Sequence, residues 1–424
     1  MEPVENHSGG ASVDTRTVLI LGGGVGGLLT ANRLRQLLPR RHRIVVVERS
    51  GIHAFAASFL WLMVGRRTAA EITRPVATLL RPGVELVVGE ASGIDLGGRV
   101  VRVGSDSLPY DYLVVATGAE LAFDAIPGLD GAHTFYTLDG AERLYHALRS
   151  FEGGKIAVVI GSLPYKCPGA PPEGAMLISS FMRQRGLADK TQVHLFTPES
   201  QPMPVAGPEL GQAVVQMLAA RGVAYHPLHS LVSVVPGEQR LAFADRDAER
   251  YDLLVAIPPH RGSALLRDAG LANPAGWVPV MPQTLAATPP GVFVIGDATA
   301  IPIPGRWQPD VPLMLPKAGV FAHSHSEVVA RNIAAEINGA RPAATFCGDG
   351  YCMLEAGEDL AGFAYGDFFA TPAPEVHLRR MGKTWHLGKV LFERWWLSPF
   401  GFRREALRLG LRWGGRALGI PVEL

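Results

Sequence analysis

The sequence has few cysteines and no long apolar run. Only Cys167, Cys347 and Cys352 occur in 424 residues, an odd and sparse set that argues against an extracellular disulfide framework and suits a reducing compartment. Residues 1–16 lack the apolar core of a secretory signal and do not read as a transit peptide, so we expect a disordered lead-in. No stretch approaches the roughly 18 to 20 uninterrupted apolar residues of a spanning helix. We therefore expect a protein that does not cross a membrane.

The composition is that of a folded protein. Apolar residues make up 47% of the chain and charged residues 19%, which excludes a disordered polymer. A length of 424 residues is too great for one ordinary domain and fits two or three. The formal net charge of +1 hides an asymmetry, because residues 377–424 contain ten Lys and Arg against three Asp and Glu. The C-terminal segment therefore has a different surface from the rest of the chain.

A glycine-rich turn follows the first predicted strand. Gly22, Gly24 and Gly27 have the G-x-G-x-x-G spacing and stand between an aliphatic strand at residues 17–21 and an apolar helical pattern. In this motif the first glycine makes the tight turn, the second lets the backbone approach a pyrophosphate, and the third lets the helix pack on the sheet. Glu48 ends the next predicted strand, where it would bind ribose hydroxyls. The segment predicts a nucleotide site rather than an ordinary turn.

Two later strands also end in turns. Residues 110–118 (YDYLVVATG) close on Thr117 and Gly118, and residues 291–298 (GVFVIGDA) contain Asp297. Both segments look like signatures of the two-dinucleotide-fold flavoproteins related to glutathione reductase, and this favours FAD at the first site. By that resemblance, the first segment lies near the cofactor phosphates and Asp297 lies on the ribityl chain. The predicted fold class is therefore α/β, with two Rossmann-like dinucleotide-binding domains of the glutathione reductase type and a C-terminal domain with amphipathic helices.

A second strand-turn-helix unit begins at residues 155–160 (KIAVVI), but its loop lacks the glycines of a phosphate loop. After Gly161 the loop has prolines on both sides of Cys167. Proline removes amide donors that a phosphate loop would use, so binding of a nicotinamide dinucleotide is disfavoured. A rigid loop can instead hold a thiol in one place. The alternative for Cys167 is a buried structural thiol, although its Pro-rich and Gly-rich setting argues against a core strand or helix.

Four further segments set this chain apart from other flavoproteins. They are the cysteine loop PYKCPGAPPE at residues 164–173, LPKAG at 315–319, GYC at 350–352, and WHLGKVLFE at 385–393. With these segments the chain resembles the sulfide:quinone oxidoreductase family and its relative, the flavoprotein subunit of flavocytochrome c sulfide dehydrogenase. The resemblance runs from about residue 16 through nearly the whole chain. It implies bound FAD, with two cysteines beside the flavin ring.

The resemblance also implies the chemistry. The two cysteines match Cys167 and Cys352, and a sulfide anion attacks one sulfur of a disulfide or sulfur bridge between them. One cysteine keeps a persulfide, the released thiolate passes two electrons into FAD, and the reduced flavin reduces a quinone. Cys347 is an alternative to Cys352, or a resolving thiol. Many family members have another cysteine after the ATG strand, but residues 119–130 contain none, which moves the chain toward the two-cysteine pattern of the flavocytochrome relatives.

Two charged residues are predicted to assist the reaction. Lys317 stands at the start of a predicted helix, where a cation and the helix amides would stabilise reduced flavin; the alternative is a surface lysine. Glu173 follows the cysteine loop and is a candidate base for sulfide or thiol protons, or equally an ordinary acid at a helix start. His323 and His325 have no cysteine or acid at ligand spacing, so we predict no metal site.

The basic tail predicts an amphipathic helix. On a helical wheel one arc contains only arginines and the opposite arc is apolar: Arg404, Arg408, Arg412 and Arg416 against Phe402, Ala406, Leu409 and Trp413. Such a helix fits a membrane surface, and we expect a peripheral protein on the cytoplasmic side. The alternative is a helix that caps the protein's own core. A nucleic-acid partner is not expected, because no recognised nucleic-acid fold surrounds the cluster.

The segments divide the chain into four predicted parts. Residues 16–130 and 275–340 form the two parts of the FAD-binding domain, residues 131–274 form the second dinucleotide-fold domain with the cysteine loop, and residues 341–424 form a quinone and membrane domain. The predicted activity is FAD-dependent oxidation of sulfide to sulfane sulfur or polysulfide, with electron transfer to a membrane quinone. The alternatives are a sulfide dehydrogenase that reduces a cytochrome c, an NADH:quinone reductase, and a non-catalytic flavin scaffold or sensor. The oligomeric state is open, with a homo-oligomer among the possibilities.

Overall fold

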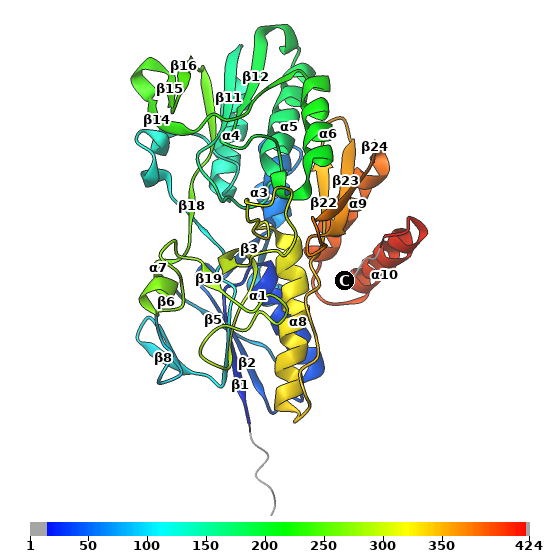
Figure 1. Ribbon diagram of the computed structural model, residues 1–424. Coiled ribbons are helices and arrows are strands. Elements are labelled where there is room, and N and C mark those ends of the chain that lie inside the picture. Colours follow the sequence, from blue (N-terminus) through cyan, green and yellow to red (C-terminus); the bar gives the residue numbers. More distant parts are fainter. Residues whose placement is uncertain (1–14, 421–424) are drawn as a thin grey trace, which may run out of the picture.

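Two parallel-sheet units and a smaller C-terminal part make up the computed structural model, which describes residues 15–420 (Figure 1). The first unit lies at the bottom of Figure 1 and the second at the top, and the C-terminal part lies beside their junction. This mixed architecture confirms the predicted α/β fold class. The lead-in expected at residues 1–16 falls almost entirely outside the described residues.

The first unit is built on a five-stranded parallel sheet in the order β20-β9-β1-β2-β5. Its strands are β1 (Thr17–Leu21), β2 (Arg43–Glu48), β5 (Glu85–Val88), β9 (Tyr112–Val115) and β20 (Val292–Val294). They come from both segments predicted for the first domain, although the predicted boundaries themselves remain untested.

Both faces of this sheet are covered, which explains why β1 is apolar throughout. Val18 and Ile20 belong to the core under helices α1 (Val25–Leu37) and α8 (Gly319–Ile337), whereas Leu19 packs with residues of a meander on the opposite face. The meander consists of β6 (Ala91–Asp95), β7 (Val100–Val103) and β8 (Asp106–Pro109), with helix α7 (Ala264–Asp268) beside it. The carboxyl ends of the strands point toward the second unit.

The second unit repeats this plan with a four-stranded parallel sheet in the order β13-β12-β11-β17. Its strands are β11 (Gly154–Ile160), β12 (Thr191–Phe196), β13 (Val223–His226) and β17 (Leu253–Ile257). Its helices are α4 (Leu138–Ser150), α5 (Ala170–Gln184) and α6 (Pro208–Ala220), and a meander of β14 (Leu231–Val235), β15 (Arg240–Phe243) and β16 (Arg246–Arg250) covers the other face. Pro171 and Pro172, at the end of the cysteine loop, lie in the first turn of α5, where their missing N–H groups cost nothing.

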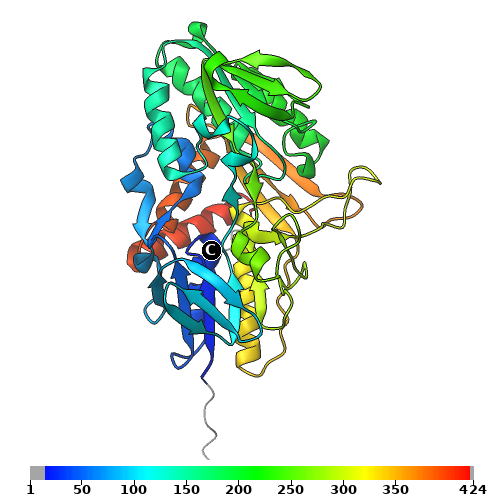
Figure 2. The same cartoon turned by 90° about the vertical axis from the view of Figure 1, so that its left-hand side faces the viewer.

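The C-terminal part joins the two units. Its antiparallel strands are β22 (Asp349–Glu355), β23 (Ala361–Asp367) and β24 (Glu375–Gly382), followed by helices α9 (Lys383–Trp396) and α10 (Phe402–Ala417). Strand β22 contacts both α5 of the second unit and α8 of the first. Both views place α10 at mid-height, between the two units (Figures 1 and 2). The C-terminal part therefore brings its residues to the end of the cysteine loop.

Single 3-10 turns lie between the elements, and the remaining α-helices and strands are short. They are α2 (Phe59–Leu62), α3 (Ala69–Ile72), β3 (Ile52–Ala54), β4 (Thr73–Pro75), β10 (Glu120–Leu121), β18 (His260–Arg261), β19 (Val278–Pro279) and β21 (Thr299–Ala300).

The end of the chain differs from the helical-wheel prediction at Arg404. This residue was predicted on an exposed basic arc, but it is buried, and its guanidinium donates to the carbonyl oxygens of Trp396 and Ser398. The same guanidinium lies over the rings of Trp395 and Phe400. The last carbonyls of α9 and two aromatic faces together form a site for a cation, and this local attraction outweighs the solvation of the arginine.

The apolar arc of α10 faces solvent. Phe402 is 90% exposed and Trp413 70% exposed, and Leu409 is also exposed. Within residues 15–420 no helix is both long and apolar enough to span a bilayer. The exposed aromatic side chains form an apolar surface on α10, and exposed apolar surfaces of this kind mark sites of interaction.

Candidate active site

The three glycines of the first turn differ in the space around them. Gly22 has a φ of +105°, and a Cβ on it would lie 2.5 Å from the carbonyl oxygen of Ala116. A Cβ on Gly27 would lie 1.9 Å from the carbonyl oxygen of Gly22, whereas a Cβ on Gly24 would meet nothing within 4 Å. The first and third glycines are thus required by the turn and by helix packing. The middle one opens onto free space at the N-terminus of α1, where a pyrophosphate would bind.

Other predicted cofactor residues surround the same opening. Glu48 ends β2 and accepts a hydrogen bond from the Gly23 amide (2.6 Å). Thr117 and Gly118 follow β9, and a Cβ on Gly118 would also meet nothing within 4 Å. Because β9 and β2 flank β1 in the sheet, the opening lies where the strand order reverses, the usual place for a dinucleotide in this type of fold.

Asp297 tests whether the residues of this opening fit a cofactor. Its Oδ1 atom is buried and has no hydrogen-bond partner. Burial raises the pKa of this carboxyl group, against the attraction of Lys166 and Lys317. A buried polar atom without a partner costs free energy, so a hydroxyl of a bound cofactor would satisfy it. The residues present therefore fit a dinucleotide.

Lys317 is not a surface lysine. Its ammonium group donates to the carbonyl oxygens of Asp297 (2.8 Å) and Thr299 (3.0 Å) and lies 3.6 Å from the ring centroid of Trp277. Burial lowers the pKa of Lys317 to about 8, against the opposing effect of Asp297. Its backbone carbonyl accepts a hydrogen bond from the amide of Cys167 at 2.6 Å. This bond ties the cysteine loop to the dinucleotide opening.

The loop holds Cys167 in an unusual conformation. Cys167 has a φ of +55°, a left-handed value that costs strain for a residue with a Cβ. Ala170 donates its amide to the carbonyl of Cys167, and Tyr136 donates its hydroxyl to the carbonyl of Lys166. Tyr165 donates to Glu199 at 2.9 Å. The surrounding structure therefore fixes the loop that carries the thiol from several sides, which is typical of strained functional residues.

Cys352 reaches the same loop from β22. A Cβ on Gly169, two residues after Cys167, would lie 3.2 Å from the sulfur of Cys352. Both residues are free thiols. Burial raises the pKa of both thiols, that of Cys167 to about 12, and the charge of Glu173 adds to both effects. Cys167 also raises the pKa of Cys352, so the two thiols interact electrostatically although 185 positions separate them.

Glu173 lies inside the protein, not at a solvated helix start. It is 2% exposed, and its Oε2 atom accepts hydrogen bonds from the ammonium of Lys389 (2.7 Å) and from the amide of Glu355 (3.0 Å). Burial raises the pKa of Glu173, and the attraction of Lys389 opposes this shift. The structure thus brings three predicted residues together, Cys167, Cys352 and Glu173.

Lys389, Glu355 and His386 were not predicted as site residues from the sequence. The side chain of His386 lies 3.0 Å from the carboxylate of Glu355, on the same face of α9 as Lys389. Lys389 and His386 belong to the WHLGK segment, which contributes to the family resemblance, but the neighbouring sequence does not reveal which residues they contact. The spacing of three residues on one helix face was the available signal.

Cys347 lies apart from this group. It is exposed on the segment before β22, and its thiol contacts only Thr345, at 3.7 Å from the carbonyl oxygen. The alternative in which Cys347 replaces Cys352 therefore has no support from the geometry.

Glu327 lies one turn after His323 on α8, but in the described residues neither histidine of this helix belongs to a group of metal ligands. His325 is buried and accepts a hydrogen bond from the amide of Gly296, and burial lowers the pKa of His323 to about 4. Within residues 15–420 no three His, Cys, Asp or Glu side chains are arranged to hold a metal ion. The absence of a metal stays a prediction.

Comparison with known proteins gives the family. A family model described as pyridine nucleotide-disulphide oxidoreductase matches residues 16–315. The mitochondrial sulfide:quinone oxidoreductase of Mus musculus is 25% identical over 386 residues, covering 87% of this chain and 82% of the mouse protein. The sulfide-quinone reductase of Aquifex aeolicus is 28% identical over 393 residues, covering 90% of each chain. More distant relatives include type II NADH:quinone oxidoreductases.

A solved structure shares the fold. The X-ray structure of the sulfide:quinone oxidoreductase from Aquifex aeolicus superposes with a TM-score of 0.83 at 24% identity, covering 97% of this chain and 96% of that one. The chain therefore belongs to the pyridine nucleotide-disulphide oxidoreductase family, as an oxidoreductase and flavoprotein whose predicted resemblance to the sulfide:quinone oxidoreductases these relatives confirm.

Proposed function

We propose that the protein binds FAD, oxidises sulfide to sulfane sulfur or polysulfide, and passes the electrons to a membrane quinone. One observation carries the proposal: the amide of Cys167 bonds to the carbonyl of Lys317, so a dithiol site adjoins a dinucleotide site. Redox cysteines react with a flavin only when they are held against it, so this adjacency is the geometric requirement of the reaction.

FAD would be held by residues of the first unit. The opening at Gly24 would take the pyrophosphate, Glu48 the ribose hydroxyls, and the unpartnered oxygen of Asp297 the ribityl chain. Lys317 would place a cation beside the flavin ring. When bound, FAD supplies an acceptor for two electrons.

The thiols carry the sulfur chemistry in this proposal. Sulfide attacks one sulfur of a Cys167–Cys352 bridge, a new sulfur–sulfur bond forms, and the bridge breaks. One cysteine keeps the added sulfur as a persulfide and the other leaves as a thiolate. The carboxylate of Glu173 and the sulfur of Cys352 both lie beside Gly169, so Glu173 is the candidate acceptor for the proton that sulfide loses.

The second unit argues against NADH as the electron donor. After the second strand of a nucleotide-binding unit, an acidic side chain usually binds the ribose. Here Glu199 follows β12 in the chain and is buried, and it accepts hydrogen bonds from Tyr165 and Thr197. Burial raises the pKa of Glu199 to about 7, and these two hydrogen bonds oppose the shift. The acid is engaged by the cysteine loop itself.

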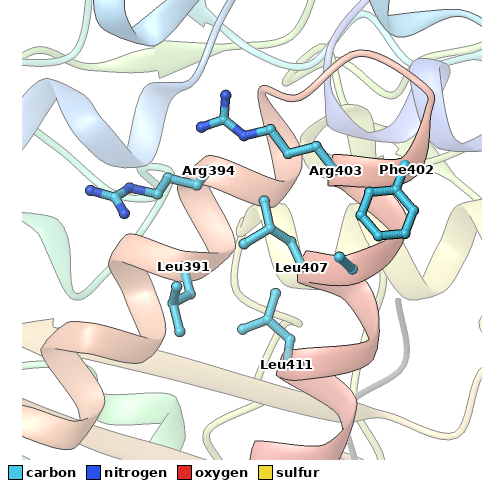
Figure 3. Close-up of a pocket in the computed structure, with 8 residues that line it drawn as sticks. Leu391, Arg394, Phe402, Arg403, Leu407 and Leu411 are labelled. Carbon is cyan, nitrogen blue, oxygen red and sulfur yellow. The ribbon is translucent and has the colours of Figure 1, made fainter.

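The acceptor side of the proposal rests on the C-terminal helices. A groove of about 510 Å³ separates α9 from α10, and its lining is mostly apolar. Leu391, Leu407 and Leu411 lie around this groove, with Arg394 and Arg403 along its edge (Figure 3). Apolar side chains next to arginines fit a surface that meets acyl chains and anionic headgroups. We propose that this surface docks on the membrane that holds the quinone; the cytoplasmic side stays a prediction.

The choice of donor and acceptor is tested by anaerobic spectroscopy of the purified holoprotein. Sulfide should bleach the oxidised flavin, an equal concentration of NADH should not, and a soluble quinone should restore the colour. Faster bleaching by NADH than by sulfide would instead identify an NADH:quinone reductase. Reoxidation by cytochrome c but not by quinone would identify a sulfide dehydrogenase of the flavocytochrome type, and no bleaching by either donor would leave a scaffold or sensor.

Membrane docking predicts a loss of vesicle binding when the exposed apolar arc is made polar. Phe402→Asp and Trp413→Asp should each weaken sedimentation with anionic vesicles at least about tenfold, because each removes about 2 kcal/mol of apolar burial in the interface. Met281→Asp, at an exposed apolar site on another surface, is the matched control and should bind like the unmodified protein. Equal binding of all three variants would contradict docking through α10.

A further inference from the structure

A buried ion pair lies beside the two thiols. Lys389 on α9 is 8% exposed and its ammonium lies 2.7 Å from Oε2 of Glu173, which is 2% exposed. Buried ion pairs contribute little to stability once the cost of removing two charges from water is counted. A pair in this position, next to reactive sulfurs, therefore calls for a chemical explanation.

The pair lies within electrostatic range of the sulfur of Cys352. A Cβ on Gly169 would lie 3.2 Å from the sulfur of Cys352 and 3.4 Å from Oε1 of Glu173, so the sulfur and the carboxylate approach the same point. The ammonium of Lys389 also lies 3.5 Å from the carbonyl oxygen of Met353, the residue after Cys352. A charge that develops on this sulfur would therefore lie close to both members of the pair.

Other charged and titratable groups lie around the thiols and the pair. Glu355 is fully buried and adds a second negative charge near Lys389, and the ring of His386 contacts its carboxylate. Further neighbours from other elements are Asp297, Tyr136 and Tyr351. The charge of Lys389 acts on both thiols. Burial opposes the charged form of Lys389, but the charges of Glu173 and Glu355 outweigh this effect and raise its pKa, so it stays protonated.

We propose that Glu173 and Lys389 form a charge-compensating pair for the sulfur chemistry, a role that rests on the proposed function. Neutral hydrogen sulfide enters and its sulfur bonds to one cysteine sulfur of the bridge. The S–H proton passes to the carboxylate of Glu173, and the electron pair of the broken bridge stays on the other cysteine as a thiolate. The negative charge thus moves from Glu173 to the thiolate, while Lys389 keeps its positive charge.

The net charge of the buried site is unchanged in this step. Before the attack the site contains the carboxylate and the ammonium, and after it the thiolate and the same ammonium. Because an uncompensated charge in a buried site is very costly, a step that conserves net charge avoids that cost. Lys389 acts through the electrostatic effect of its ammonium group on the thiolate and is a positioning residue, whereas Glu173 accepts the proton itself.

The proposal predicts opposite effects of the two residues on the thiols. The charge of Glu173 raises both thiol pKa values and that of Lys389 lowers both. In a reduced holoprotein with Cys347→Ser, so that only the two site thiols remain, Glu173→Gln should speed alkylation by iodoacetamide at pH 8 at least about tenfold. Lys389→Met should slow it at least about tenfold, and the double variant should lie between the two.

Controls separate this role from a purely structural one. Lys383→Met removes an exposed lysine from the same helix and should leave the alkylation rate unchanged, and Lys389→Arg should restore most of the rate lost in Lys389→Met. Loss of packing alone would move both single variants in the same direction, and that result, or an unchanged rate in both, would overturn the proposal.

A second measurement links the pair to turnover. Both Glu173→Gln and Lys389→Met should slow flavin reduction by sulfide, since one lacks the proton acceptor and the other the compensating charge, while reoxidation by quinone stays at the original rate. Unslowed flavin reduction in Lys389→Met would also overturn the proposal. Because alkylation uses neither sulfide nor quinone, a failure of the proposed function would appear as no flavin reduction in the unmodified protein, whatever the alkylation rates.

Discussion

Cys167→Ser is expected to slow flavin reduction by sulfide more than about a thousandfold while the flavin stays bound. A serine hydroxyl forms no sulfur bridge and is a far weaker nucleophile and leaving group than a thiol. The backbone bond from residue 167 to Lys317 does not use the side chain, so the loop and the cofactor opening should keep their geometry. Stopped-flow absorbance under anaerobic conditions measures the rate, and the flavin spectrum measures cofactor content.

Two companion variants make this result specific. Cys352→Ser should lose as much as Cys167→Ser, and the double variant little more, because residues that act as one unit have non-additive effects. Cys347→Ser should stay within about twofold of the unmodified rate, since its thiol is exposed and contacts only Thr345. A Cys167→Ser protein that still bleaches at the unmodified rate would remove the dithiol from the mechanism.

Gly24→Val is expected to fold but to lose its flavin. The backbone of Gly24 has a φ of −76° that any L-residue adopts, and an added Cβ meets nothing within 4 Å, so the polypeptide tolerates a side chain there. That open space is where a pyrophosphate must approach the N-terminus of α1, so the valine methyl groups would block it. Flavin content after purification should fall at least about tenfold, which corresponds to about 1.4 kcal/mol.

Gly27→Val is the contrasting variant. Its Cβ would lie 1.9 Å from a backbone oxygen that cannot move aside without shifting β1 from α1. We expect it to lower the free energy of unfolding of the flavin-free protein by about 1 to 3 kcal/mol or more, whereas Gly24→Val should leave that quantity nearly unchanged. Chemical denaturation of the two apoproteins measures both values. Full flavin content in Gly24→Val would show that the opening is not the cofactor site.

The sequence was sufficient where function depends on neighbours along the chain. Gly22, Gly24 and Gly27 act over six residues, so their roles follow from spacing alone, and the observed φ value and Cβ contacts agree with them. The aliphatic run at residues 17–21 likewise predicted a strand, and β1 occupies these residues. The prolines around Cys167 indicated a loop with few amide donors. In the structure, Lys166 and Cys167 of this loop make hydrogen bonds to Tyr136 and Lys317, which belong to other segments.

The sequence was insufficient where distant segments pack together. Lys389 and Glu173 are 216 positions apart, and only the packing of α9 and β22 against α5 makes them partners. The burial of Arg404 was not predicted, because a helical wheel does not include the carbonyls and rings at the end of α9. The link between Lys317 and Cys167 runs through a backbone carbonyl, which carries no sequence signal at all.

The engagement of Glu199 by Tyr165 has a consequence for selectivity. An enzyme that binds a dinucleotide donor gains affinity from the adenosine half, far from the reacting atoms. In the second unit of this protein the acidic side chain of Glu199 is not free to bind an adenosine ribose. A small donor such as sulfide must therefore be distinguished from competing molecules by the reactivity of its attacking atom. Other small nucleophiles should therefore differ from sulfide in the rate at which they open the sulfur bridge, not in their binding affinity. For the slow ones, the rate of flavin reduction should rise with concentration without reaching a plateau.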